Sequence, residues 1–141
     1  MNIGQILQRP LVTIPSGTTV LEASKLMVDN NMGLLVIMEP GNKKLAGVIS
    51  ERDVMKAIAS GRTLRDQVDV VSTKQVVTVK ASSDVAEAAK AMNKNRIRHV
   101  VVVDDQGAPI GVVSMRDLVG ERATLTAILQ SHEKEVFIGG D

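Results

Sequence analysis

Two short segments of this sequence place a serine and an aspartate three residues apart, a spacing that can bind a sugar or cap a helix. They read Gly47-Val48-Ile49-Ser50-Glu51-Arg52-Asp53 and Gly111-Val112-Val113-Ser114-Met115-Arg116-Asp117. The apolar residues before each serine are typical of a buried strand that ends there. An aspartate at a helix start can accept hydrogen bonds from both vicinal hydroxyls of a ribose, and the serine can add one more.

The same Ser-x-x-Asp pattern is also typical of a helix N-cap. The serine hydroxyl then accepts a hydrogen bond from the amide three residues later, and the acid faces the positive end of the helix dipole. A cap alone requires neither the glycine nor aspartate in place of glutamate, and the pattern occurs twice after matching apolar runs. Capping and ligand binding can coexist at one helix start.

A catalytic interpretation of these residues has little support. The side-chain types of a hydrolytic triad are present in Ser114, His99 and Asp117. However, no nucleophile-elbow pattern surrounds the serine, and the first copy of the repeat has no counterpart of this three-residue combination. The chain has no cysteine, and the other imidazole, His132, lies in a polar tail. We therefore expect no catalytic residue, no metal site and no enzymatic activity.

Composition excludes several classes of partner. The 141 residues are 44% apolar and 23% charged, with 17 basic and 16 acidic side chains, so charge does not favour nucleic acid or an anionic membrane. One aromatic residue, Phe137, cannot build the stacking platforms of single-strand binders. Apolar runs such as 34–38 and 100–103 are far shorter than the roughly 18 residues of a membrane helix. The start of the chain does not resemble a signal peptide, and we expect a soluble, cytoplasmic protein.

The chain is a doubled sequence. Residues 12–14, Val-Thr-Ile, match residues 77–79, Val-Thr-Val, at an offset of 65, as 77 − 12 = 65. From Gly47 onward the offset is 64, as 111 − 47 = 64, and the slip falls in a turn, where length varies at little cost. Such internal repetition predicts two structural units of one kind.

Each copy predicts the order strand, helix, strand, strand, helix. The predicted strands are 11–14, 34–38 and 45–49 in the first copy and 75–79, 100–103 and 109–113 in the second. Helix starts are marked at 19–22 and 82–84, and again at Ser50 and Ser114. We predict an α+β fold with repeats at 1–62 and 63–121, packed sheet to sheet with pseudo-twofold symmetry, a connector at 61–71 and a tail at 122–141.

The two signatures, their spacing and this element order resemble a pair of CBS domains, the cystathionine-β-synthase-type repeat of the Bateman module, over residues 1–121. The resemblance implies adenosine binding in the clefts between the repeats, with the ribose on Ser50 and Asp53 or on Ser114 and Asp117. It also implies a further set of binding residues. Thr13, Ile14, Thr78 and Val79 would line the base pockets, and Arg52 and Arg116 would face the phosphate.

The two implied sites are not equal. Family geometry places the start of one repeat's second strand at the phosphate of the other repeat's site, and these starts are Gly33-Leu34 and Arg98-His99. The site of Asp53 would thus gain Arg98 and His99, a guanidinium and an imidazole suited to a phosphate. The alternative is that Arg98 is a solvated strand end and His99 a half-buried filler.

The sequence therefore predicts a non-catalytic regulatory module, without a required cofactor, that binds an adenine nucleotide or related adenosyl compound. AMP, ADP, ATP, S-adenosylmethionine and NAD all present the ribose, so the sequence does not choose among them. Apolar positions at 54–58 and 118–119 suggest a homodimer, and signalling would act on an unidentified effector protein. The alternative is a scaffold protein with vestigial clefts whose tail, 121–141, contacts a partner.

Overall fold

A computed structural model describes residues 1–7, 11–41, 44–120, 126 and 128–130. The chain divides into two compact units. The first-repeat unit consists of Val12–Val76, and the second-repeat unit combines Met1–Leu11 with Val77–Asp141. Each unit is described separately below.

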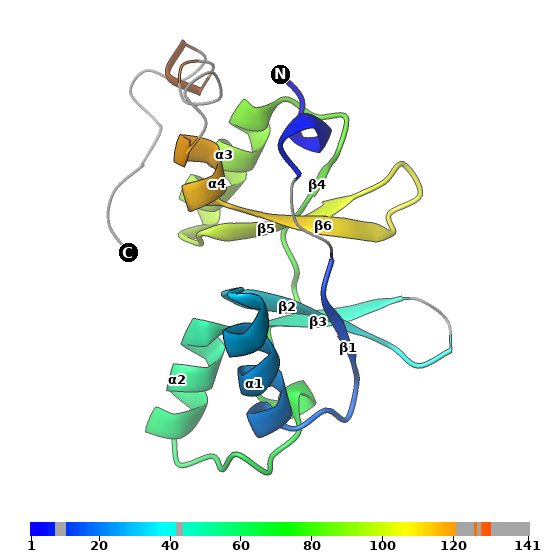
Figure 1. The fold of residues 1–141 in the computed structure, drawn as a ribbon, viewed down its shortest axis with the longest axis vertical. Coiled ribbons are helices and arrows are strands. Elements are labelled where there is room, and N and C mark those ends of the chain that lie inside the picture. The colour runs from blue at the N-terminus through cyan, green and yellow to red at the C-terminus, as the bar shows by residue number, and fades with distance from the viewer. Residues whose placement is uncertain (8–10, 42–43, 121–125, 127, 131–141) are drawn as a thin grey trace. The chain divides into compact units, whose positions relative to one another are not determined.

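The first-repeat unit is a three-stranded sheet covered by two helices. Its elements are β1 (Thr13–Pro15), α1 (Val20–Asn30), β2 (Leu34–Met38), β3 (Leu45–Ser50), α2 (Glu51–Ala59) and a 3-10 turn, η2 (Val68–Val70). The strand order is β1-β2-β3, with β1 parallel and β3 antiparallel to β2. Figure 1 shows α1 and α2 on the same face of this sheet.

The second-repeat unit repeats this plan. It contains η1 (Ile3–Ile6), β4 (Thr78–Lys80), α3 (Val85–Asn95), β5 (His99–Val103), β6 (Pro109–Ser114) and α4 (Met115–Gly120). Its sheet order is β4-β5-β6, again with one parallel and one antiparallel pair. The α+β class and the predicted element order are confirmed, whereas the packing of one repeat on the other stays a prediction.

The first helix of each repeat begins where the sequence predicts it. The Thr19 hydroxyl accepts from the amide of Glu22 at 3.1 Å, and the Asp84 carboxylate accepts from the amide of Ala86 at 2.9 Å. Such caps satisfy amides that have no partner within the helix. Each helix is followed by a C-cap residue in the left-handed conformation, Asn31 after α1 and Arg96 after α3.

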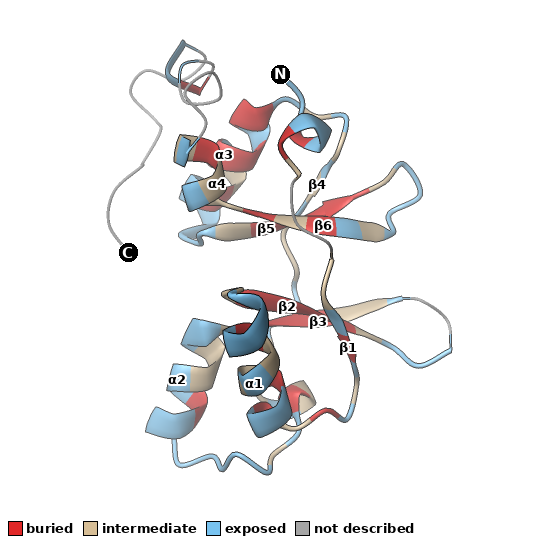
Figure 2. Ribbon diagram, in the orientation of Figure 1, coloured by how far each residue is buried: buried red, intermediate tan, exposed pale blue. Residues whose placement is uncertain are grey.

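Each unit has its own hydrophobic core, drawn in red in Figure 2. The core of the first-repeat unit is formed by Ile14, Ala23, Met27, Leu35, Ile37, Ile49 and Val68. The core of the second-repeat unit includes Ile3, Ile6, Met92, Leu118 and Ile128. Ile128 belongs to the predicted tail at 122–141; apart from Thr126 and residues 128–130, that tail lies outside the described residues.

Each unit is completed by the segment that precedes the other repeat. We call these segments the N-terminal leader, Met1–Leu11, and the middle leader, residues 63–76. The amide of Ile3 donates to the carbonyl of Ser83 at 2.9 Å, and the amide of Val68 donates to the carbonyl of Thr18 at 2.8 Å. Because 68 − 3 and 83 − 18 both equal 65, the two contacts are the same contact in the two repeats.

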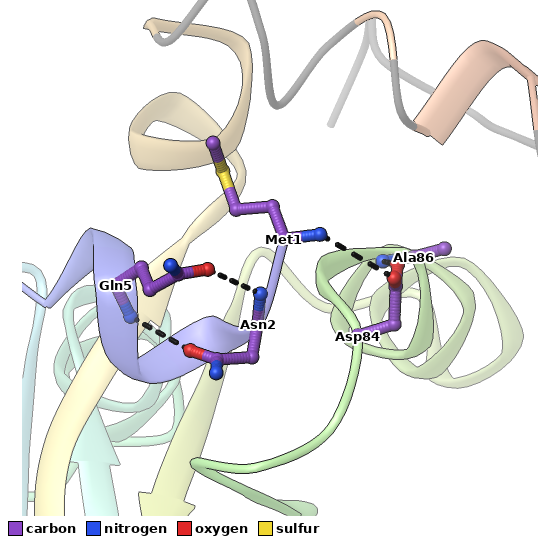
Figure 3. Close-up of polar contacts among 5 residues, drawn as sticks. All are labelled: Met1, Asn2, Gln5, Asp84 and Ala86. Atoms are coloured by element: carbon purple, nitrogen blue, oxygen red, sulfur yellow. Dashed lines mark hydrogen bonds and ion pairs between the residues drawn. The ribbon is translucent and has the colours of Figure 1, made fainter.

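The N-terminal leader is fixed at its first turn, as Figure 3 shows. Asn2 and Gln5 form a reciprocal capping box. The Asn2 side chain accepts from the backbone amide of Gln5 at 3.1 Å, and the Gln5 side chain accepts from the backbone amide of Asn2 at 2.8 Å. The terminal ammonium of Met1 lies 3.8 Å from the Asp84 carboxylate, at the cap of α3. The capping box stabilises the first turn of the leader, and the ion pair attaches the start of the chain to the second repeat.

The leaders correct one prediction from the sequence. The segment 61–71, interpreted as a polar connector, contains Val68, which is fully buried in the core of the first-repeat unit. The repeat boundaries 1–62 and 63–121 stay a prediction, and within the compact units each leader packs on the repeat that it does not precede. Sequence order alone does not indicate this exchange.

Candidate functional site

Both Ser-x-x-Asp motifs lie at the junction between the last strand and the last helix of a repeat. The amide of Ser50 donates to Asp53 Oδ2 at 2.9 Å, and the Ser50 hydroxyl accepts from the amide of Asp53 at 3.1 Å. Ser114 and Asp117 repeat this arrangement with the same two distances. The capping interpretation is therefore correct at both junctions.

Capping leaves acceptor capacity on each carboxylate. An ionised aspartate offers about four lone-pair positions on two oxygens, and the cap amide occupies one of them. Asp53 and Asp117 are both half-buried, so each retains a route to solvent. Each junction can thus cap its helix and still accept hydrogen bonds from the hydroxyls of a ligand.

The neighbouring strand holds each junction in place. Leu34 pairs with Ser50, and the carbonyl of Gly33 accepts from the amide of Glu51 at 3.0 Å. In the second repeat His99 pairs with Ser114, and the carbonyl of Arg98 accepts from the amide of Met115 at 2.8 Å. Within its own unit, the Arg98-His99 pair therefore adjoins the junction of Asp117. That Arg98 and His99 contact a phosphate bound at the site of Asp53 stays a prediction.

Thr73, in the middle leader, contacts the carboxylate of Asp53. Its hydroxyl lies 3.3 Å from Oδ1 and 3.4 Å from Oδ2 and donates to the carboxylate. Reciprocal backbone hydrogen bonds of 3.0 and 2.9 Å join Thr73 to Val48 in β3. The position that corresponds to Thr73 is residue 8, a glutamine outside the described residues.

The glycine of the first signature has a structural reason. A Cβ on Gly47 would stand 2.8 Å from the carbonyl oxygen of Thr73, a backbone atom. At Gly111 the corresponding close neighbour, also at 2.8 Å, is a terminal methyl carbon of Leu7. In both repeats the glycine admits a leader beside the last strand.

The predicted base-pocket residues lie on the other edge strand of each sheet. Thr13 pairs with Val36 and Thr78 with Val101, so the central strand separates each threonine from the last strand of its sheet, about 10 Å away at two strand spacings. Both threonines are exposed. The side chain of Ile14 is only 2% exposed and packs in the core, so its main chain is what a ligand could contact.

The four predicted basic residues are accessible or partly so. Arg52 and Arg116 are exposed in the first turns of α2 and α4, one residue before each aspartate. Arg98 is exposed and His99 is half-buried. These positions are compatible with contact to a phosphate, and the phosphate roles themselves stay predictions.

Thr73 is the candidate site residue that sequence reasoning missed. The signal was present, because the offset of 65 extends upstream of residue 12 and matches Ile3 with Val68 and Ile6 with Val71. Following that match would have shown that the leaders are repeated as well. It would not have shown which repeat each leader packs against.

Two further features concern only the described part of the chain. It contains no group of three or more histidine, cysteine, aspartate or glutamate side chains arranged to hold a metal ion. Within the same residues, no helix has the length and apolar character needed to cross a membrane.

This pair of α+β repeats, each closed by a capped Ser-x-x-Asp junction, defines a class of protein. The family model of the CBS domain matches residues 3–60 and 67–123. The chain therefore belongs to the CBS domain family and contains two copies of the domain.

Individual relatives support this assignment. An uncharacterised 17.7 kDa protein of Acidianus ambivalens is 34% identical over 116 residues, covering 82% of this chain and 70% of the relative. The CBS domain protein PAE2072 from Pyrobaculum aerophilum, complexed with AMP, is 34% identical with a TM-score of 0.88, covering 92% of this chain and 99% of that one.

A further solved structure is the CBS domain pair of protein MJ0100 in complex with 5′-methylthioadenosine and S-adenosyl-L-methionine. It is 29% identical with a TM-score of 0.78, and the match covers 85% of this chain and 94% of that one. Among curated relatives, the chain spans 56% to 70% of the length of three of them.

Proposed function

We propose that this chain is a regulatory module that binds an adenosine-containing ligand and transmits its occupancy to a partner protein. The carboxylates of Asp53 and Asp117 hold the ribose hydroxyls, and Ser50 and Ser114 fix these carboxylates through the caps. The single observation that carries the proposal is the repeated junction, in which the same cap distances present a half-buried aspartate twice.

The ligand class is supported by the solved relatives. One was solved with AMP and another with 5′-methylthioadenosine and S-adenosyl-L-methionine, which have adenosine in common. Because the ribose is shared and the 5′ substituents differ, a ribose site built on aspartate is compatible with all three. The remaining members of the proposed binding set lie around the base and the 5′ substituent: Thr13, Ile14, Thr78, Val79, Arg52, Arg116, Arg98 and His99.

The module acts by binding and not by catalysis. The Ser114 hydroxyl accepts from the amide of Asp117, and the Asp117 carboxylate accepts from the amide of Ser114. Both side chains thus serve the cap, which is a poor arrangement for a nucleophile and its orienting acid. No cofactor is required, and we further propose a cytoplasmic location, which cell fractionation would test.

Equilibrium titration tests the proposal. AMP, ADP, ATP, S-adenosylmethionine and NAD are titrated into the full chain by calorimetry, with inosine monophosphate as a control for the base. We expect saturable binding of at least one adenosine compound. Failure of all five to bind would overturn the proposal and favour a scaffold function.

We also propose that the protein acts as a homodimer. Val28 in α1 and Met55 and Ile58 in α2 are 79%, 69% and 60% exposed, which is high for apolar side chains on neighbouring helices. A second subunit would remove this surface from water. Leu118, expected from the sequence to add to it, is instead fully buried in the core, so the proposed interface rests on Val28, Met55 and Ile58, the most exposed large apolar side chains among the described residues.

A further inference from the structure

Among the described residues, the carboxylate of Asp53 has a side-chain hydroxyl donor in addition to its cap amide, and the carboxylate of Asp117 has the cap amide. Oδ2 of Asp53 accepts from the cap amide, and the Thr73 hydroxyl reaches both oxygens at 3.3 and 3.4 Å. In the described part of the chain, Asp117 has the cap contacts with Ser114 and no matching hydroxyl. The sequence provides glutamine at the equivalent leader position, residue 8.

The second donor restricts the orientation of the carboxylate. A single amide fixes one oxygen but leaves the plane of the carboxylate free to turn about that contact. A hydroxyl placed between both oxygens opposes this rotation, although its distances exceed the 2.7–2.8 Å typical of O–H···O bonds, so each individual bond is weak. We therefore expect the Thr73 hydroxyl to orient the Asp53 carboxylate and to add little to the stability of the fold.

Thr73 is itself held firmly in position. Its amide and carbonyl form a reciprocal pair with Val48 at 2.9 and 3.0 Å, and Gly47 allows that close approach because it has no Cβ. Val48 lies two residues before Ser50 on β3. The hydroxyl and the cap are therefore positioned by the same strand, which suits a preorganised site.

We infer that Thr73 is a positioning residue that preorganises Asp53 for the ribose and makes the two aspartate sites unequal. The inference rests on the proposed function, because Asp53 must be the ribose acceptor for its orientation to affect affinity. Ordering a side chain on binding costs about 0.5 to 1.5 kcal/mol, so loss of the hydroxyl should weaken binding about two- to tenfold. The carboxyl group itself would still be present.

The test uses the full chain in an Asp117→Ala background, so that calorimetric titration with AMP reports the site of Asp53. Thr73→Val removes the hydroxyl and keeps the branched shape, while Thr73→Ser keeps the hydroxyl. We expect Thr73→Val to weaken AMP binding about two- to tenfold and Thr73→Ser to restore most of it. Thr63→Val is the matched control, because it removes a hydroxyl from the same leader whose partner is the Arg65 amide.

A double-mutant cycle separates positioning from a structural role. With Asp53→Asn present, Thr73→Val should cause no further loss of AMP affinity, whereas a general loosening of the unit would weaken binding in both backgrounds. Urea unfolding of each variant checks that the populations compared are folded.

The outcomes distinguish this inference from the proposed function. If the unsubstituted chain and the Asp117→Ala variant bind no adenosine compound, the proposed function fails and the role of Thr73 fails with it. If they bind AMP but Thr73→Val binds equally well, or Thr73→Ser is as weak as Thr73→Val, the role of Thr73 alone is overturned.

Discussion

Gly47 lies so close to Thr73 that a Cβ on the glycine would stand 2.8 Å from the threonine's carbonyl oxygen. That oxygen accepts from the amide of Val48, so it cannot move without breaking the bridge between the middle leader and β3. Gly47→Ala should therefore destabilise the chain by about 1–3 kcal/mol, the usual cost of overpacking. Urea unfolding measures the change, and a loss of AMP affinity should accompany it because Thr73 is displaced from Asp53.

Gly111→Ala is the matched substitution in the second repeat. Its Cβ would meet the end of the Leu7 side chain, which can rotate away, and alanine is favoured over glycine within a strand. We expect a net change below about 1 kcal/mol. Equal destabilisation by the two substitutions would show that the backbone contact at Gly47 has no special role.

Asp69, in the middle leader, should make a contribution to the stability of the fold that depends on pH. The amide of Gly17 donates to Asp69 Oδ1 at 2.8 Å and is the main reason why the pKa of Asp69 lies below its usual value of 3.8. The Ser16 hydroxyl and the charge of Lys74 lower this pKa further, and burial opposes them in part.

The sign follows from the lowered pKa. A carboxyl group whose pKa is lower in the folded state stabilises the fold above its unfolded pKa, and this contribution is lost as the pH falls through the folded pKa. Asp69→Asn should therefore reduce stability at neutral pH and flatten its decline below about pH 4. Urea midpoints at several pH values measure both effects, and parallel curves for the two proteins would contradict the assignment.

The sequence predicted the regular elements well because their signals are local. The strand bounds 34–38 agree with the structure, and Thr19 and Asp84 cap α1 and α3 as expected. The Ser-x-x-Asp junctions followed from their repetition. Thr73 was missed because its contact with Asp53 spans 20 residues and depends on where the middle leader packs. That placement depends on burial of Val68, which the sequence does not distinguish from the neighbouring Val70 and Val71 in a stretch without periodicity.

Met55 tests the proposed homodimer. Met55→Glu places a charge on the exposed apolar side of α2, so burial of that helix against a second subunit would require desolvating an unpaired carboxylate. We expect the variant to elute as a monomer at concentrations where the unsubstituted chain is a dimer, as measured by light scattering. Val70→Glu is the control, because Val70 is also exposed but lies in η2, outside α1 and α2.

Asp53 and Asp117 should contribute unequally to ligand affinity. Without Asp53 the ribose loses two hydrogen bonds to a charged acceptor, and each contributes about 1.5 to 3 kcal/mol. We therefore expect ligand affinity at the tighter site to fall at least about a hundredfold. Asp117→Ala should affect only the weaker site. Calorimetry on both variants gives the comparison, with unfolding curves to account for the weakened caps, and equal losses would mean that the two sites do not differ.

Arg98 tests whether a phosphate is recognised separately from the ribose. Its guanidinium can pair with the phosphate of AMP, whereas adenosine presents no phosphate. Arg98→Ala should therefore weaken AMP by roughly tenfold, about the value of one hydrogen bond to a charged group, and leave adenosine affinity nearly unchanged. Performing the titrations in the Asp53→Ala and Asp117→Ala backgrounds assigns Arg98 to a site, because its effect should vanish in the background that lacks its own aspartate. An Arg98→Ala variant that weakens AMP and adenosine alike would show that Arg98 supports the fold and does not bind phosphate.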